Sequence, residues 1–346
     1  MNDANELISF IASMSGEGNL RVEENLGEGY VRLRVSEAER RQAKHDIQHV
    51  EDIVIEMLRN ARDAGADKVY LATTKEEGVR TLLFLDNGSG VPQDMQERIF
   101  DARVTSKLES MKMDRWGVHG RGMALFSIKQ NTDEARVVTS GVDLGSAFKV
   151  CVATDRLGER ADQSSWPQAV KDEDGRYVCA RGPHNIIRAA CEFALEELRC
   201  CDVYLGSPSE IAATLYAQAS SRLDTSRLLF IDDECELPVI DRLGLASDAE
   251  DFIRICSGLG LEMSERTAHR ILSGQIKPVR GVTARLLRER DSTSHAPAPV
   301  DLAKDRRGLR IAKDDMAQFS RAVERDFNDL AARYYLNLCG DPKIRV

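Results

Sequence analysis

The chain has 346 residues, of which 42% are hydrophobic and 30% are charged; this is the ordinary composition of a globular protein with a substantial core. Its formal net charge of −9 excludes a surface that is basic throughout, although a local basic patch remains compatible with it. No apolar run reaches the length of a membrane span, and the N-terminus lacks the basic start of a signal peptide. The eight cysteines form no CxxC pair, which favours reduced thiols. We therefore expect a cytoplasmic protein without membrane contact.

Hydrophobic periodicity predicts alternating helices and strands until about residue 245 and helices afterwards. In chain order the expected elements are a helix at 6–14, a strand at 30–35, a charged helical run before residue 50, the helix around Glu56, strands at 68–73 and 80–86, a helix at 123–130, strands at 135–140 and 147–154, a helix at 185–198, a strand at 202–206 and a helix at 209–219. The expected segments are a first α/β domain (1–155), a linker or long loop (156–175), a second α/β segment (176–245), a helical segment (246–292), a Pro/Ala spacer (293–300) and a C-terminal helical segment (301–346).

The helix around Glu56 carries two stripes of side chains. Its apolar stripe repeats at the helical spacing and predicts a face packed on a sheet. That stripe consists of Val50, Ile53, Val54, Met57, Leu58 and Ala61. Glu56, Asn60 and Asp63 form a polar stripe beside it, at the border of the core, while Arg59 and Arg62 are expected to point elsewhere. By themselves, three polar residues favour a solvated helix edge.

The end of the strand at 80–86 reads Asp86-Asn87-Gly88-Ser89-Gly90. An Asn-Gly pair is also typical of a hairpin turn. That interpretation explains neither the aspartate at the end of an apolar strand nor the second glycine, which lets a ligand approach the backbone. A carboxylate only accepts hydrogen bonds, so Asp86 is suited to an exocyclic amine such as that of adenine.

A glycine-rich turn precedes the helix at 123–130. Gly117, Gly120 and Gly122 lie three and two residues apart. Backbone N–H groups at a helix N-terminus bind anions such as phosphates, although the same spacing fits a flexible loop. The chain has no Gly-Lys pair, so a Walker-type phosphate loop is excluded.

The order of these three motifs resembles the GHKL ATPases, which include DNA gyrase B subunits, MutL, topoisomerase VI B subunits, heat-shock chaperones and histidine kinases. The runs at 60–69 and 101–108 are most similar to MutL, and the run at 117–125 is closer to gyrase. The resemblance covers about residues 45–150. It implies a Bergerat ATP-binding fold, an α/β (α+β) sandwich, over 1–155. It also implies ATP and Mg²⁺ as cofactors and a closing lid over 91–122. A histidine kinase is not expected, because His45 and His49 leave no room for a phosphoacceptor hairpin before Asn60.

The resemblance implies a role for each matching residue of the first two motifs. Glu56 matches the general base that activates water. Asn60 matches the Mg²⁺ ligand, and Asp63 a supporting residue near the adenine. Asp86 matches the adenine reader, with Gly88 and Gly90 shaping the base pocket.

The remaining matches concern the phosphates. Lys107 resembles the lid lysine of MutL, and Ser146 stands where the family usually has a threonine. The phosphate-binding turn is matched by Gly117, Val118, His119, Gly120, Arg121 and Gly122. Arg121 is bulkier than the residue that family members often have there, so lid closure is expected to differ.

Two further patterns have competing interpretations. His45 and His49 have the spacing of a zincin helix with an aspartate in place of glutamate, but a charged helix face is the better interpretation.

In the segment 247–290, Ser264 is expected to cap a helix that buries Ala268, Ile271 and Leu272, and a second helix is expected from about Val279. This pair is similar to a phage-repressor helix-turn-helix, in which Glu265, Arg266 and Arg270 would reach base edges. Gln275 and Lys277 alternatively resemble a gyrase loop that touches the γ-phosphate. A packed helical bundle is the third interpretation.

These observations predict a Mg²⁺-dependent ATP-binding protein and slow ATPase, acting as a nucleotide-gated dimerising clamp. Residues 264–310 contain eleven Lys/Arg and five Asp/Glu, an excess that favours DNA as a partner. The overall acidity favours the alternative, an ATP-dependent protein remodeller or signalling adaptor with an unknown protein partner and no DNA contact. The resemblance implies a homodimer in which the N-terminal segments pack across the two subunits.

Overall fold

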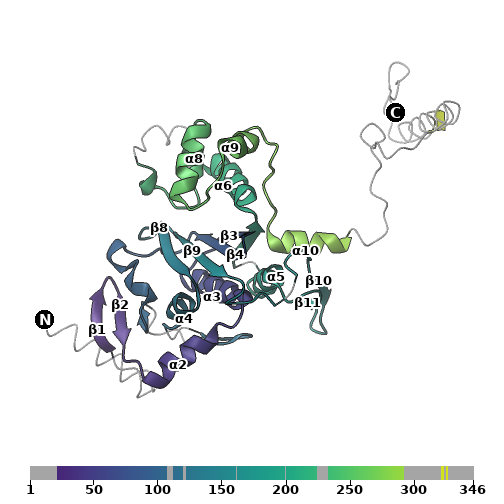
Figure 1. Cartoon of the computed structure of the whole chain (residues 1–346). Coiled ribbons are helices and arrows are strands. Elements are labelled where there is room, and N and C mark those ends of the chain that lie inside the picture. Colours follow the sequence, from purple (N-terminus) through teal and green to yellow (C-terminus); the bar gives the residue numbers. More distant parts are fainter. Residues whose placement is uncertain are drawn as a thin grey trace. The chain divides into compact units, whose positions relative to one another are not determined.

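The computed structural model describes residues 22–106, 112–119, 122–160, 162–198, 200–223, 233–291, 321–322 and 325 (Figure 1), with the backbone alone at 112–113, 117–119 and 288–291. Its contacts divide the chain into two units, Met1–Arg290 and Asp291–Val346. All elements below belong to the first unit, except that the last helix ends at Asp291. The predicted helix at 6–14 lies outside the described residues, and the predicted helical segment at 301–346 does so apart from residues 321–322 and 325.

A five-stranded sheet with the order β12-β3-β4-β9-β8 forms the centre of this unit. Its strands are β3 (Lys68–Glu76), β4 (Val79–Asp86), β8 (Glu134–Ser140), β9 (Ser146–Ala153) and β12 (Asp202–Gly206). Neighbours are antiparallel, except that β12 runs parallel to β3. The register places Asp86 at the end of β4 opposite Ser146 at the start of β9, so two predicted site residues meet at one edge of the sheet.

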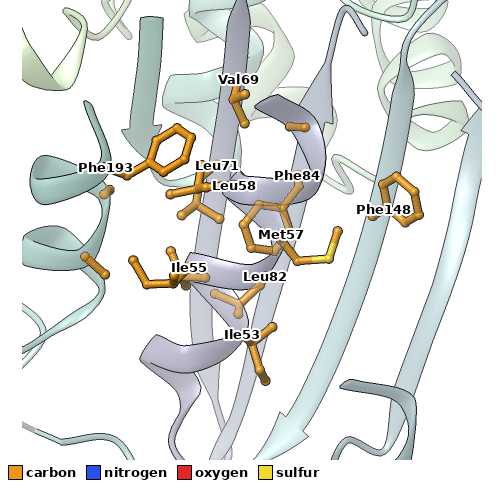
Figure 2. Close-up of a cluster of buried hydrophobic side chains, with 14 of the residues drawn as sticks. Ile53, Ile55, Met57, Leu58, Val69, Leu71, Leu82, Phe84, Phe148 and Phe193 are labelled. Atoms are coloured by element: carbon orange, nitrogen blue, oxygen red, sulfur yellow. The ribbon is translucent and has the colours of Figure 1, made fainter. Parts of the chain in front are cut away.

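Helices cover both faces of the sheet, because its strands alternate apolar side chains to either side. Leu82 and Phe84 of β4 belong to the core on one face, and Leu83 and Leu85 to the core on the other. The helices of the first face are α3 (Val50–Asp63), α4 (Ala124–Asn131), α5 (Ile186–Glu196) and α10 (Val282–Asp291). Those of the second face are α6 (Pro208–Arg222), α8 (Ala249–Gly258) and α9 (Glu265–Leu272). Figure 2 shows the apolar stripe of α3 packed on β3 and β4, as its periodicity predicts.

Smaller elements surround this sandwich. They are β1 (Val22–Gly27), β2 (Tyr30–Leu33), α2 (Glu37–Asp46), β5 (Val104–Thr105), β6 (Lys112–Asp114), β7 (Gly117–His119), β10 (Gln168–Lys171), β11 (Tyr177–Arg181) and short 3₁₀ turns at Gln93–Met95, Arg98–Phe100, Glu234–Glu236 and Arg242–Leu245. Strands β1, β2 and β5 form one small sheet, and β6–β7 and β10–β11 form hairpins. In the described part of the chain, no helix has both the length and the apolar character needed to span a bilayer.

Local signals in the sequence fix the helix starts. The Asp52 carboxylate accepts the backbone N–H of His49 at 2.9 Å before α3. Ser207 and Glu210 form a reciprocal capping box at α6, and the Ser264 hydroxyl accepts the N–H of Thr267 at α9. The predicted cap at Ser264 is thereby confirmed, and each cap satisfies N–H groups that have no partner within the helix.

The domain pattern differs from the prediction in two respects. Strand β12 comes from the segment expected to be separate, yet it pairs with β3 in the central sheet. The chain reaches this position from β9 through residues 154–201, which include α5. Helices α9 and α10 do not form a packed pair. Ala268 of α9 is buried in the core of the second face, whereas Val282 and Leu286 of α10 are buried in that of the first. The mixed α/β class itself is confirmed.

The described cysteines are all free thiols. Burial raises the pKa of Cys201 and of Cys256 to about 12 and that of Cys179 to about 11. Thiols with such pKa values are almost entirely protonated at neutral pH and are poor nucleophiles. These residues therefore contribute to packing.

Candidate functional site

A cleft of about 620 Å³ lies beside the central sheet. Its wall is built from α3, from the ends of β4 and β9, and from the start of α4. The predicted site residues that line it are Glu56, Asn60, Asp63, Asp86, Gly90, Gly122 and Ser146. Residues spread over the chain from α3 to β9 therefore meet around one space, whose volume is typical of a small-molecule site.

The polar stripe of α3 faces this cleft, but the expectation for its arginines is wrong. Arg59 donates through Nη1 to Glu56 Oε1 at 2.6 Å, and Arg62 donates through Nε to Asp63 Oδ1 at 3.0 Å. For Arg59 the reason is geometric, since residues three apart on a helix are neighbours on its surface and long side chains bridge them. Arg59 therefore lines the cleft, and Arg62 contacts a residue that lines it.

Asp114 joins these arginines from a distant part of the chain. It lies at the end of β6, and its carboxylate accepts Nε and Nη2 of Arg59 at 2.9 and 2.8 Å. Arg62 also donates to Asp114 at 3.2 Å and to Glu197 at 3.1 Å. The sequence analysis missed this network, because Arg59 and Asp114 are 55 residues apart and no local pattern connects them.

The end of β4 brings a buried carboxylate to the cleft. Asp86 is 4% exposed, and its Oδ1 accepts the N–H of Gly88 at 2.8 Å. Ser146 lies opposite, and its hydroxyl is 2.9 Å from that of Ser140. A side chain at Gly88 would meet Ala64 at the end of α3, so this glycine permits close packing of the helix on the strand end; it does not line the cleft.

Gly90 has a different structural requirement. Its φ is +69°, and an added Cβ would lie 1.8 Å from the carbonyl oxygen of Gly141. Only glycine adopts this conformation readily and leaves room for that contact. The second glycine of the motif therefore determines how the loop at 87–90 closes against the loop before β9.

Asn60 has an unmet hydrogen-bonding requirement. Its side-chain nitrogen is buried and makes no hydrogen bond to the residues that the structure describes. Buried amides are nearly always paired, so an unpaired amide in a cleft fits a residue that a ligand completes. The unpaired atom is a hydrogen-bond donor, so it suits an acceptor atom of a ligand. Throughout the described chain, no group of three or more His, Cys, Asp or Glu could hold a metal, so the zincin interpretation of His45 and His49 finds no support.

The predicted phosphate turn is only partly described. Gly117, Val118 and His119 form strand β7, paired with β6, where a bare turn was expected. Gly122 has a φ of +67° and lines the cleft; its carbonyl accepts the N–H of Arg103 at 2.9 Å. Lys107, Gly120 and Arg121 lie outside the described residues.

Apolar side chains complete the cleft, and the sequence analysis assigned none of them to the site. They are Met57, Phe84, Val91, Ile99, Val104, Leu125 and Phe148, with Tyr30 and Trp116 beside them. Burial raises the pKa of Tyr30, and a hydrogen bond with Ser106 opposes the change. An apolar wall next to a few polar groups is the usual composition of a pocket for an aromatic ligand.

The residues of the candidate helix-turn-helix lie away from the cleft. Glu265, Arg266 and Arg270 are exposed on α9, and Gln275 and Lys277 are exposed after it. Because α9 packs on the second face of the sheet, neither Gln275 nor Lys277 lines the cleft. The alternative interpretation, in which this loop touches a γ-phosphate, stays a prediction.

Comparisons with known proteins agree with the fold and the cleft. Residues 47–148 match the family described as histidine kinase-, DNA gyrase B-, and HSP90-like ATPase. This range runs from the residues before α3 to β9 and includes the three motifs. The predicted resemblance is thereby confirmed over residues 47–148, which are similar to the GHKL ATPases.

Several relatives are DNA mismatch repair proteins MutL. The protein from Brucella abortus (strain S19) is 34% identical over 112 residues, 32% of this chain and 18% of that protein. The protein from Thermodesulfovibrio yellowstonii is 31% identical over 107 residues, 30% of this chain and 19% of that protein. The chain thus matches less than a fifth of the length of these relatives. Among solved structures, full-length ShkA in complex with AMPPNP is 17% identical, covers 66% of this chain and 48% of its own, and has a TM-score of 0.24, too low to support any inference.

Proposed function

We propose that this chain binds ATP together with Mg²⁺ in the cleft beside α3 and hydrolyses it slowly, with Glu56 as the general base. The observation that supports this most is the convergence of Glu56, Asn60, Asp86 and Ser146 on one cleft of about 620 Å³ within the range that matches the GHKL family. A solvated helix edge, the competing interpretation of the polar stripe, would not bring these residues together with β4 and β9.

The adenine would lie between the apolar walls, with its exocyclic amine donating to Asp86. The phosphates would extend toward Gly122 and the start of α4, and Asn60 would hold Mg²⁺ through its amide oxygen. When bound, Mg²⁺ would neutralise phosphate charge. Glu56 would accept a proton from the attacking water, so the residues of the cleft would act mainly by positioning and charge.

We further infer that the ATPase cycle gates a dimerising clamp on DNA. Two observations support this: the relatives named DNA mismatch repair proteins, and the exposed Arg266, Arg270, Lys277 and Arg280 in and after α9. The net charge of −9 favours the second candidate, a protein remodeller or adaptor without DNA contact. Retention on DNA-cellulose with and without a non-hydrolysable ATP analogue separates the two, and light scattering under both conditions tests the dimer.

The ATPase proposal is tested by phosphate release. Glu56→Ala should lower the rate by about 10²–10⁴-fold, the usual contribution of a general base, while still binding a non-hydrolysable analogue. Removal of Mg²⁺ with EDTA should stop hydrolysis by the unaltered protein. Glu250→Ala, an exposed glutamate of α8 on the second face, serves as the control and should keep the full rate. An unchanged rate in Glu56→Ala would reject the assignment.

A further inference from the structure

Arg59 is a charged residue that the core of this protein has almost completely enclosed. It is 2% exposed, and each of its guanidinium nitrogens donates to a carboxylate. Nε and Nη2 form a two-pronged contact with Asp114 at 2.9 and 2.8 Å, and Nη1 contacts Glu56 at 2.6 Å. The guanidinium group thus lies between a residue of the cleft and a residue of the β6–β7 hairpin.

We propose that Arg59 is the positioning residue for Glu56 and that Asp114 fixes Arg59 in the orientation this requires. The proposal rests on the proposed function, because it assigns Glu56 the role of general base. In this arrangement, the base is held by a contact between α3 and a distant hairpin, and the backbone of α3 alone does not determine its orientation.

Arginine is suited to this task in a way that lysine is not. Its planar group carries donors at fixed angles, so one side of it can grip Asp114 while another points at Glu56. A glutamate side chain otherwise rotates about several bonds, and a general base must stay within hydrogen-bond reach of its water. Misplacement of a catalytic group by about 1 Å can cost on the order of 10²-fold in rate.

The hairpin that carries Asp114 is itself held firmly against α3 and α5. Asp114 Oδ1 accepts the N–H of Trp116 at 3.0 Å, and its other oxygen accepts Arg62 at 3.2 Å. Trp116 stacks on Phe193 of α5 with ring centroids 6.2 Å apart, and Arg115 lies 3.5 Å from Glu192. Asp114 therefore has a defined position from which to orient Arg59.

The competing explanation is that the ion pair between Arg59 and Glu56 only stabilises the fold. Variants that keep or change the charges of the network separate this explanation from a positioning role. The network holds the carboxylates of Glu56, Asp63, Asp114 and Glu197 against the cations Arg59 and Arg62. Deleting Arg59 would remove the cation between Glu56 and Asp114 and could unfold the protein. Arg59→Lys retains the charge and loses the two-pronged geometry, and Asp114→Asn retains the shape and removes one negative charge. Both changes are therefore mild enough to give folded protein.

The experiment compares these variants with a matched pair elsewhere. Arg80 is also buried, at 7% exposed, and donates to Glu159 at 2.7 Å, but neither residue lines the cleft. The controls are Arg80→Lys and Glu159→Gln. For all proteins, three quantities are measured: the melting temperature, the Kd for a non-hydrolysable ATP analogue by calorimetry, and kcat for phosphate release with Mg²⁺.

A positioning role predicts a loss in kcat without a loss in binding. Arg59→Lys should lower kcat about 100-fold and Asp114→Asn about tenfold, with Kd within about threefold of the unaltered protein, because only the reacting geometry is disturbed. The controls should keep the original kcat. In a Glu56→Gln background, Arg59→Lys should lower kcat no further, because no base remains to be positioned.

Different results would reject the positioning role of Arg59 and the proposed function. If the unaltered protein hydrolyses ATP and both variants keep its kcat, or if the controls lose as much, Arg59 does not position Glu56, and the proposed function stands. If the unaltered protein neither binds the analogue nor hydrolyses ATP, the proposed function fails and this inference fails with it. Should Arg59→Lys not fold, Asp114→Asn decides alone.

Discussion

The two faces of the central sheet are both covered by helices, yet they bury different kinds of side chain. On the first face, α3 buries Glu51 and Arg59; on the second, α6 buries Ile211 and Leu215 and α8 buries Phe252. Buried charge costs free energy unless each group is paired, whereas buried apolar area stabilises directly. The first face therefore combines a large apolar core with buried ion pairs beside the cleft, whereas helices α6 and α8 of the second face bury mainly apolar side chains.

The difference between the two faces is tested most strongly by removing one large aromatic side chain from each face. Phe252 is 0% exposed on the second face, and Phe84 is 2% exposed on the first and lines the cleft. Either change to Ala should lower the free energy of unfolding by about 3–5 kcal/mol, measured by urea denaturation. Only Phe84→Ala should also weaken analogue binding. A tenfold loss of affinity in folded Phe252→Ala would show that the faces are not separate in function.

A smaller effect is expected at the glycines that shape the first face. Gly90 and Gly78 both have positive φ, +69° and +81°, but only Gly90 has an atom closer than 4 Å to an added Cβ. Gly78→Ala should cost about 1–2 kcal/mol for the left-handed conformation alone. Gly90→Ala should cost more, because the loop must shift, and it should reduce affinity for the analogue. Thermal denaturation and calorimetry measure both; equal losses in the two variants would mean that the contact with Gly141 is unimportant.

The smallest expected effect lies on the outer side of the second face. If DNA binds there, replacing both Arg266 and Arg270 with Ala should flatten the salt dependence of DNA binding by about one unit of slope per lost phosphate contact. The control replaces Arg176 and Arg181, which are exposed near the β10–β11 hairpin, so the change in net charge is the same. If both double variants flatten the salt dependence of DNA binding equally, the binding depends only on net charge, and the result favours the adaptor role.

Local patterns allowed much of the first face to be predicted from the sequence. The apolar period of α3 predicted its packing on the sheet, and the run from Asp86 to Gly90 marked a strand end with an unusual carboxylate. On the second face, the cap at Ser264 predicted where a helix begins. Each of these features depends on residues within a few positions of one another, where spacing alone fixes geometry.

Features that depend on distant contacts could not be predicted in this way. The addition of β12 to the sheet depends on pairing with β3, more than a hundred residues earlier. The separation of α9 from α10 onto opposite faces depends on which core each apolar stripe meets. The orientation of Arg59 depends on Asp114. In all three cases, the arrangement depends on a partner that is distant in sequence. A helical or strand period gives no information about which residues will be partners.

The central claim, that an adenine nucleotide binds on the first face with Asp86 as its reader, is tested most directly by base discrimination. Calorimetry should compare non-hydrolysable ATP and GTP analogues, with Mg²⁺, on the unaltered protein and on Asp86→Asn. Adenine presents an amine donor where guanine presents a carbonyl acceptor, and a hydrogen bond to a charged group contributes about 1.5–3 kcal/mol. The unaltered protein should therefore prefer the ATP analogue by about 10–100-fold, and Asp86→Asn should lose most of that preference. Equal affinity of the unaltered protein for both analogues, or the same preference in Asp86→Asn, would contradict the account.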